Sequence, residues 1–303
     1  MMQVSTSHFY DSTTSLMQQL SKQADTLNTQ IATTKKLSKP SDDVVAYQRL
    51  TTIKQANADD ASYTSNISLA SSLLQQSDTT LGNVETQLQR AAELAVQANS
   101  GTLNAGDRTA IATELQGIRD QLVSLANTKD ARGQPLFAAA TGDSAVTQAA
   151  DGSVSFTGSG TPAGIPIGDG ITVQPTESAA RVFGGVPVAG GGTTDMFAAL
   201  NSMIGALASN DVAGISAGGD GVQAALTQIG TMRASLGARA ARVDLQQASV
   251  KDAATAREVD RSALEDTDVT AAITDLQKTM TVLQATQASF TKLSSLSLFN
   301  YLK

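Results

Sequence analysis

Neighbouring carboxylates are the residues of this sequence best suited to acid–base chemistry. They form three pairs: Asp42/Asp43, Asp59/Asp60 and Glu265/Asp266. Two carboxylates with separated pKa values can act as general acid and base in glycoside hydrolysis. The first and third pairs stand at expected helix starts, where a carboxylate accepts backbone N–H groups and meets the positive end of the helix dipole. Helix capping is therefore the prediction for them, and no catalytic residue is predicted.

The sequence lacks the residues that usually bind transition metals or act as activated nucleophiles. The chain has no Cys and a single His, His8, which excludes thiolate zinc sites, two-histidine metal sites and cysteine nucleophiles. Residues 168–170 and 218–221 have the Gly-Asp composition of calcium loops without their spaced oxygen ligands, so both stretches predict turns. Phosphate-loop and nucleophile-elbow motifs do not occur. The expectation is a protein without cofactor or metal that is not an enzyme.

Composition excludes further classes of function. The 303 residues carry a net charge of −7 with no strongly basic patch, so nucleic acid is not an expected partner. No window approaches the roughly 18 apolar residues that span a membrane. The first residues lack a positive segment followed by an apolar one, so a cleaved export signal is not expected.

Glycine, proline and charge divide the chain into three parts. Residues 133–230 hold 19 of the 24 Gly, 5 of the 6 Pro, seven acidic residues and one basic residue, Arg181. Helix breakers are thus concentrated in the middle. We predict a small β-rich domain over 133–230, a long-helix bundle from 42–132 with 231–266, and terminal coiled-coil segments 1–41 with 267–303. The predicted fold class is mainly α with an inserted α+β middle.

Local patterns place elements within these parts. In the middle, strands are expected at 153–157, 171–173 and 181–183, and a helix at 194–209. Outside it, one helix is expected from Asp42 to about Asn99 and another from a cap at 104–107 to near Lys129. Thr267 is the expected cap of the last helix, which runs towards Ser294.

Both flanks carry apolar residues at alternating steps of three and four, the spacing of a coiled-coil seam. The longest series is Ile67, Ala70, Leu74, Ser77, Leu81, Val84, Leu88, Ala91 and Ala95. A second is Ile229, Met232, Leu236, Ala240, Val243, Gln247, Val250 and Ala254. The terminal series are Leu16, Leu20, Ala24, Leu27 and Ile31 at one end, and Val269, Ile273, Leu276, Met280, Leu283 and Phe290 at the other. Because isolated narrow-seam helices are marginal in water, we expect the terminal segments to order on assembly.

Several short segments occur together in a fixed order. They are STSHFY at 5–10, KPSDD at 39–43, LANTKD at 125–130 with LFA at 136–138, LGAR at 236–239, LEDTD at 264–268, and LSLFNYL at 296–302. In this combination they resemble the flagellin superfamily, over about two thirds of the chain. The closing segment is similar to the branch of that superfamily that joins hook to filament.

The resemblance implies a structural role at the hook–filament junction of the bacterial flagellum, outside the cell. It implies export through the flagellar type III apparatus with a dedicated chaperone. The implied partners are hook-associated protein 1, flagellin and other copies in a ring, and the middle domain would face outward. The implied assembly interface consists of Phe9, Leu16, Leu20, Leu27, Ile31, Ile273, Leu276, Met280, Leu283, Phe290, Leu293, Leu298, Phe299 and Tyr301.

Other interpretations remain open at this point. A filament-forming flagellin would share most of these segments. The middle domain is also compatible with a surface module that binds a glycan or host molecule, or with a carboxylate-only glycosidase. A cytoplasmic coiled-coil signalling protein would account for the heptads, although not for the inserted domain or the aromatic termini.

Overall fold

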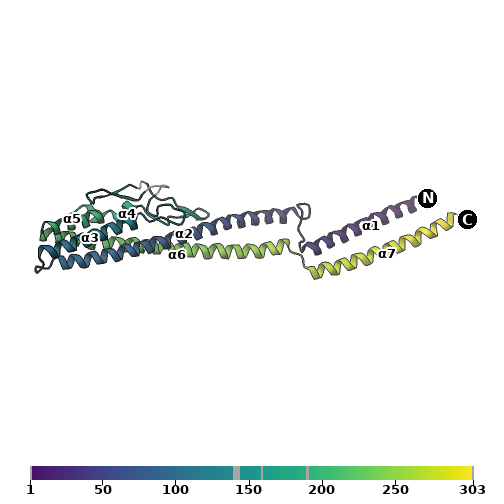
Figure 1. Ribbon diagram of the computed structural model, residues 1–303. Helices are drawn as coiled ribbons and strands as arrows, with labels where there is room; N and C mark the ends of the chain where they lie inside the picture. The colour runs from purple at the N-terminus through teal and green to yellow at the C-terminus, as the bar shows by residue number, and fades with distance from the viewer. Residues whose placement is uncertain (1, 139–143, 158–159, 189–190, 302–303) are drawn as a thin grey trace. The chain divides into compact units, whose positions relative to one another are not determined.

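The computed structural model describes residues 2–138, 144–157, 160–188 and 191–301. It divides into two compact units, each described here by itself: unit 1 is Met1–Ala58 with Ala253–Lys303, and unit 2 is Asp59–Asp252. The helices are α1 (Met2–Thr33), α2 (Val44–Ala98), α3 (Ala105–Ala126), α4 (Ala179–Phe183), α5 (Met196–Ala208), α6 (Val212–Glu265) and α7 (Val269–Tyr301), coloured along the chain in Figure 1. The predicted mainly-α class with a small inserted region of strands is confirmed.

The core of unit 2 is a helical bundle of α2, α3, α5 and α6. All nine residues of the longest predicted series, from Ile67 to Ala95, are buried on α2. On α6, the predicted series is buried at Ile229, Leu236, Val243 and Val250, whereas Gln247 is exposed. Steps of three and four keep these residues on one face of each helix, which is why the sequence pattern identified them.

The starts of α2 and α3 follow the predicted capping chemistry. Asn104 accepts a hydrogen bond from the backbone N–H of Asp107 at 2.9 Å, and Asp107 accepts one from the N–H of Asn104 at 3.1 Å. This is a complete capping box, and it starts α3 where expected. Asp43 accepts from the N–H of Ala46 at the start of α2.

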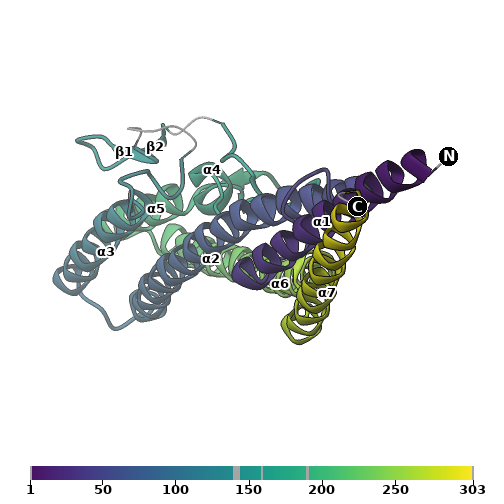
Figure 2. The same ribbon diagram turned by 90° about the vertical axis from the view of Figure 1, so that its right-hand side faces the viewer.

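Among the described residues of unit 2, the strands form three two-stranded antiparallel hairpins. They pair β1 (Val146–Gln148) with β2 (Val154–Phe156), β3 (Ile165–Gly168) with β4 (Ile171–Val173), and β5 (Val186–Pro187) with β6 (Thr193–Thr194). Two of the predicted strands coincide with β2 and β4. The β1–β2 hairpin lies over α3 (Figure 2), where Asn127 donates to the carbonyl oxygen of Val146.

The third predicted strand, 181–183, is wrong, because these residues belong to helix α4. Val182 and Phe183 are both buried, and the Phe183 ring contacts the rings of Phe137 and Phe197 at centroid distances of 5.4 and 5.8 Å. Consecutive residues of a strand point to opposite faces. A helical turn can instead direct both side chains into one core.

Arg239 of α6 anchors the segment that precedes α4. Its guanidinium donates to the carbonyl oxygen of Gln174 at 2.9 Å and to the carboxylate of Glu177. The Glu177 side chain is only 5% exposed, and Arg181 lies 3.5 Å from its other oxygen. The inserted region is therefore attached to the bundle through a buried carboxylate and an arginine from a distant part of the chain.

The glycine stretch at 218–221 is helical, so the predicted turn is wrong there; the turn predicted at 168–170 is confirmed between β3 and β4. The glycines allow α6 to approach its neighbours closely. A Cβ on Gly218 would lie 2.5 Å from the Cβ and 2.9 Å from the Cα of Met203, and one on Gly221 would lie 3.0 Å from the Cβ of Ala199. Close packing against α5 therefore selects glycine inside this helix.

We expect Gly218→Ala to lower the free energy of unfolding by about 1–3 kcal/mol, because the added methyl group forces α5 and α6 apart. Gly230→Ala in the same helix has open space around its Cβ, and it should stabilise by up to about 1 kcal/mol through helix propensity. Urea denaturation of both variants measures the difference. Equal effects at the two positions would show that close packing does not select the glycine.

Candidate functional site

The terminal helices α1 and α7 form an antiparallel pair within unit 1 and lie side by side in Figure 1. At one end, the rings of Tyr10 and Phe290 meet edge to face at 5.1 Å. At the other, the N–H of Lys36 donates to the carbonyl oxygen of Glu265 at 2.8 Å, and that of Thr267 donates to Thr34 at 2.9 Å. The two chain ends, far apart in sequence, therefore pack on each other.

The seam of this pair follows one heptad pattern on each helix. Its members are Tyr10, Thr13, Met17, Leu20, Ala24, Leu27 and Ile31 on α1, and Val269, Ala272, Leu276, Thr279, Leu283, Thr286 and Phe290 on α7. Of these, only the small residues Ala24, Ala272 and Thr279 are fully buried, while the large ones remain half-buried. A two-helix pair thus leaves much of its apolar seam open to further packing.

The predicted interface residues divide between this seam and its surroundings. Six of them lie in the seam: Leu20, Leu27, Ile31, Leu276, Leu283 and Phe290. Four are exposed beside it, with exposed fractions of 41–44%: Phe9, Leu16, Ile273 and Met280. Placing Leu16, Ile273 and Met280 on the seam was therefore wrong for the single chain. The side chains of Leu293, Leu298, Phe299 and Tyr301 lie outside the described residues.

The seam residues that sequence reasoning missed are small or polar. On α7, Ala272, Thr279 and Thr286 occupy every second seam position, where the apolar series instead suggested Ile273 and Met280. A search for large apolar residues passes over these three. The strict spacing of seven between them is the signal that could have found them.

A buried ion-pair cluster in unit 1 connects the segment that follows α1 with the end of α6. Glu265, only 4% exposed at its side chain, contacts the ammonium group of Lys35 at 2.6 Å and the guanidinium of Arg261 at 2.8 Å. The Glu265/Asp266 pair lies at the end of α6, so its predicted helix-start capping is wrong. Asp268, rather than Thr267, caps α7 by accepting from the N–H groups of Thr270 and Ala271.

Acid–base chemistry is not favoured at this cluster. The Lys35 hydrogen bond is the main reason that the pKa of Glu265 is lowered, despite the opposing effect of burial. The hydrogen bond from Ser262 is the main reason that the pKa of Asp266 is lowered too. Both carboxyl groups therefore stay ionised at neutral pH and cannot donate a proton as a general acid.

The cluster predicts a pH-dependent stability of unit 1. Because the pKa of folded Glu265 lies below its ordinary 4.5, its contribution is complete above that value and is lost as the pH falls below it. We expect Glu265→Gln to cost about 1–3 kcal/mol at pH 7, reduced by the exposure of Lys35, and less at pH 3.

The measurement is hydrogen exchange of α1 amides at both pH values. Glu258→Gln is the matched control, since Glu258 also pairs with Arg261 but is 60% exposed. Equal effects of the two substitutions at pH 7 would contradict a special role of the buried carboxylate.

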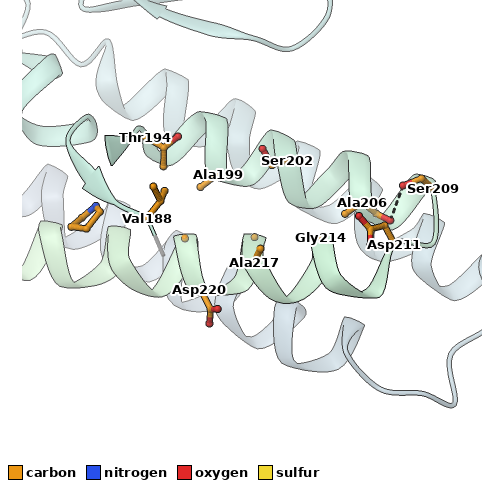
Figure 3. A pocket seen from close by; sticks show the side chains of 13 residues that line it. Val188, Thr194, Ala199, Ser202, Ala206, Ser209, Asp211, Gly214, Ala217 and Asp220 are labelled. Carbon is orange, nitrogen blue, oxygen red and sulfur yellow. Dashed lines mark hydrogen bonds between the residues drawn. The ribbon is translucent and has the colours of Figure 1, made fainter. Parts of the chain in front are cut away.

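Unit 2 contains a groove of about 530 Å³ between α5, α6 and the β5–β6 hairpin, shown in Figure 3. Small side chains line it, among them Ala199, Ala206 and Ala217, with Ser202 and the acidic Asp220 nearby. No His, Lys or Arg belongs to this lining. Within the described part of the chain, no group of His, Cys, Asp and Glu is placed to hold a metal ion. The described lining therefore offers hydroxyl and carboxylate groups without an imidazole or an amine beside them.

No helix in the described ranges combines the length and apolarity needed to cross a membrane.

Two family profiles match this chain and show the class of protein to which it belongs. The profile of the bacterial flagellin N-terminal helical region matches residues 4–141, and that of the C-terminal helical region matches residues 220–302. These matches include most of α1, all of α2 and α3, most of α6 and all of α7. The chain belongs to the bacterial flagellin family.

Within that family, named relatives match over almost the whole chain. Flagellar hook-associated protein 3 of Escherichia coli is 30% identical, with 90% of this chain and 91% of that protein aligned. The protein of the same name from Salmonella typhimurium is 28% identical, with 98% and 99% aligned. A flagellar junction protein from Legionella pneumophila shares the fold at a TM-score of 0.61 and 17% identity, covering 72% of this chain and 100% of that one. The chain is a structural component of the flagellum.

Proposed function

We propose that this chain joins the hook to the flagellin filament. The observation that carries the proposal is the alignment with two proteins named flagellar hook-associated protein 3 over 90% or more of the chain. The expected partners are hook-associated protein 1 on the hook side, flagellin on the filament side, and other copies of this chain in a ring.

The open seam of the α1–α7 pair supports a mechanical role. Large residues such as Leu20, Leu276 and Phe290 are only half-buried in the single chain. Burial of this apolar surface in contacts with neighbouring subunits would contribute about 25 cal/mol of favourable free energy per Å². This burial would supply the driving force for assembly. We infer that the interface residues, including those near the C-terminus, complete their packing only in the assembled flagellum.

We infer that the chain leaves the cell through the flagellar type III apparatus. A dedicated chaperone would cover the terminal apolar residues before export, since exposed apolar surface promotes aggregation. The acidic middle, 133–230, would face outward, where charge keeps a surface soluble.

Deletion of the gene tests the proposal. We expect hooks without filaments and intact flagellin released into the medium, measured by immunoblotting and electron microscopy. Re-expression of the chain should restore filaments. If the protein is instead a filament-forming flagellin, filaments will be shortened or absent without a released pool of another flagellin, and the proposal would be wrong.

A further inference from the structure

Strand β4 has a free edge, because among the described residues no strand other than β3 pairs with it. In the hairpin, Ile165 lies opposite Val173 and Pro166 lies opposite Thr172. The carbonyl oxygen of Pro166 points away from β4, since it accepts a hydrogen bond from the Asn66 side chain on α2 at 2.8 Å. Backbone groups of an antiparallel pair alternate between facing the partner and facing outward. The N–H and C=O of Thr172 therefore point away from β3.

Helix α6 runs beside this free edge. Arg239 donates to the carbonyl oxygen of Gln174 at 2.9 Å, and this carbonyl points to the same side of the chain as that of Thr172. At the turn end of the hairpin, a Cβ on Gly168 would lie 2.6 Å from Nε2 of Gln246. Within the described residues, no group of α6 forms a hydrogen bond with the backbone of Thr172. The edge thus faces the helix without being paired to it.

A groove of about 400 Å³ lies between the edge and the helix. This volume falls in the range of about 300–1,000 Å³ that is typical of ligand sites. The lining consists of Gly164, Thr172, Val173, Gln174, Arg239 and Arg242. It contains two guanidinium groups and no acidic side chain. Arg239 is already paired with the buried carboxylate of Glu177, so the charge that remains available in the groove belongs to Arg242.

Arg242 is exposed, and no described carboxylate forms an ion pair with it. Asp244 lies on the opposite side of α6, because positions two apart on a helix differ by about 200°. Asp169 belongs to the turn after Gly168, which lies near Gln246, one helical turn beyond Arg242. A guanidinium without a partner favours a carboxylate from a bound molecule, since this pair forms strong charge-assisted hydrogen bonds.

We propose that this groove binds an extended, carboxylate-bearing peptide segment of another flagellar protein. The backbone of the segment pairs with Thr172 as an added strand, and its carboxylate pairs with Arg242. A second copy of this chain is not the favoured occupant, because acidic residues in its described loops already stabilise their own turns. Asp151 accepts from the N–H of Ser153, and Asp195 accepts from the N–H of Ala198. The proposal goes beyond a junction role and does not depend on it.

Binding of labelled peptides to the purified full-length chain tests the chemistry of the groove. The probes are the peptides TVTETVT and TVTKTVT, measured by fluorescence polarisation. We expect the glutamate peptide to bind with a dissociation constant of about 1 mM or lower, and the lysine peptide to bind about fivefold more weakly. Arg242→Glu should reverse this preference. Arg49→Glu, the same change at an exposed arginine outside the groove, should leave it unchanged.

Thr172→Pro tests the added strand, because it removes the outward N–H without removing a hydrogen bond to β3. It should weaken binding of the glutamate peptide, with circular dichroism showing that the fold is kept. Equal binding of the two peptides by the native chain, or no saturable binding, would overturn the proposal. Equal effects of Arg242→Glu and Arg49→Glu would overturn it too.

Photocrosslinking in assembled flagella tests the source of the segment. The photoreactive residue p-benzoylphenylalanine replaces Thr172, and mass spectrometry locates the crosslinked residues after irradiation. We expect the crosslink to lie within a few residues of an Asp or Glu in a different flagellar protein. A crosslink to a second copy of this chain would overturn the assignment of the occupant. Flagella that contain the variant without any crosslink would overturn it as well.

Discussion

Leu276→Asp is expected to leave cells with hooks but without filaments. Leu276 is half-buried in the α1–α7 seam, and further burial on assembly would enclose an unpaired carboxylate. Such a charge costs about 3 kcal/mol or more in each copy, and the cost recurs in every subunit of the ring. Motility and the flagellin content of the medium measure the outcome.

Thr274→Asp is the control for this substitution, since Thr274 is exposed on the same helix and outside the α1–α7 seam. It should leave filament attachment unchanged. Urea denaturation of unit 2 should be the same for both variants, because neither residue belongs to it. Normal filaments with Leu276→Asp would show that the seam does not take part in assembly.

Arg239→Met is expected to lower the free energy of unfolding of unit 2 by about 3 kcal/mol. The substitution removes the donor to Gln174 and leaves the buried Glu177 carboxylate with only the more distant Arg181. A buried group that loses its partner retains its full desolvation cost. Urea denaturation followed by circular dichroism measures the change.

Two further variants make this expectation specific. Arg242→Met changes an exposed arginine on the same helix and should stay within about 0.5 kcal/mol of the native protein. Adding Glu177→Gln to Arg239→Met should recover part of the lost stability, because the unpaired charge is then removed. Equal losses for Arg239→Met and Arg242→Met would contradict the anchoring role of Arg239.

The long helices could be predicted from the sequence because their burial is periodic. The stripe from Ile67 to Ala95 is buried on one face of α2, as its spacing indicates. The capping box of Asn104 and Asp107 was equally visible, since it depends on residues three apart. Local interactions of this kind determine helix existence and helix starts.

Errors arose where distant packing decides the structure. Gly218 and Gly221 had the composition of a turn, but contact with α5 keeps them helical. Val182 and Phe183 had strand propensity, but the aromatic core selects a helical turn. For the candidate interface, three of the seven seam residues of α7 are small or polar, so a search for large apolar residues selected Ile273 and Met280, which lie beside the α1–α7 seam.

The position of the protein along the flagellum tests the central claim most directly. Immunogold labelling of sheared flagella that retain their hooks, with antibody raised against the purified chain, reports that position by electron microscopy. A hook–filament junction protein should give a single cluster of label at the boundary between hook and filament. Label along the whole filament, or flagella without label, would contradict a junction role.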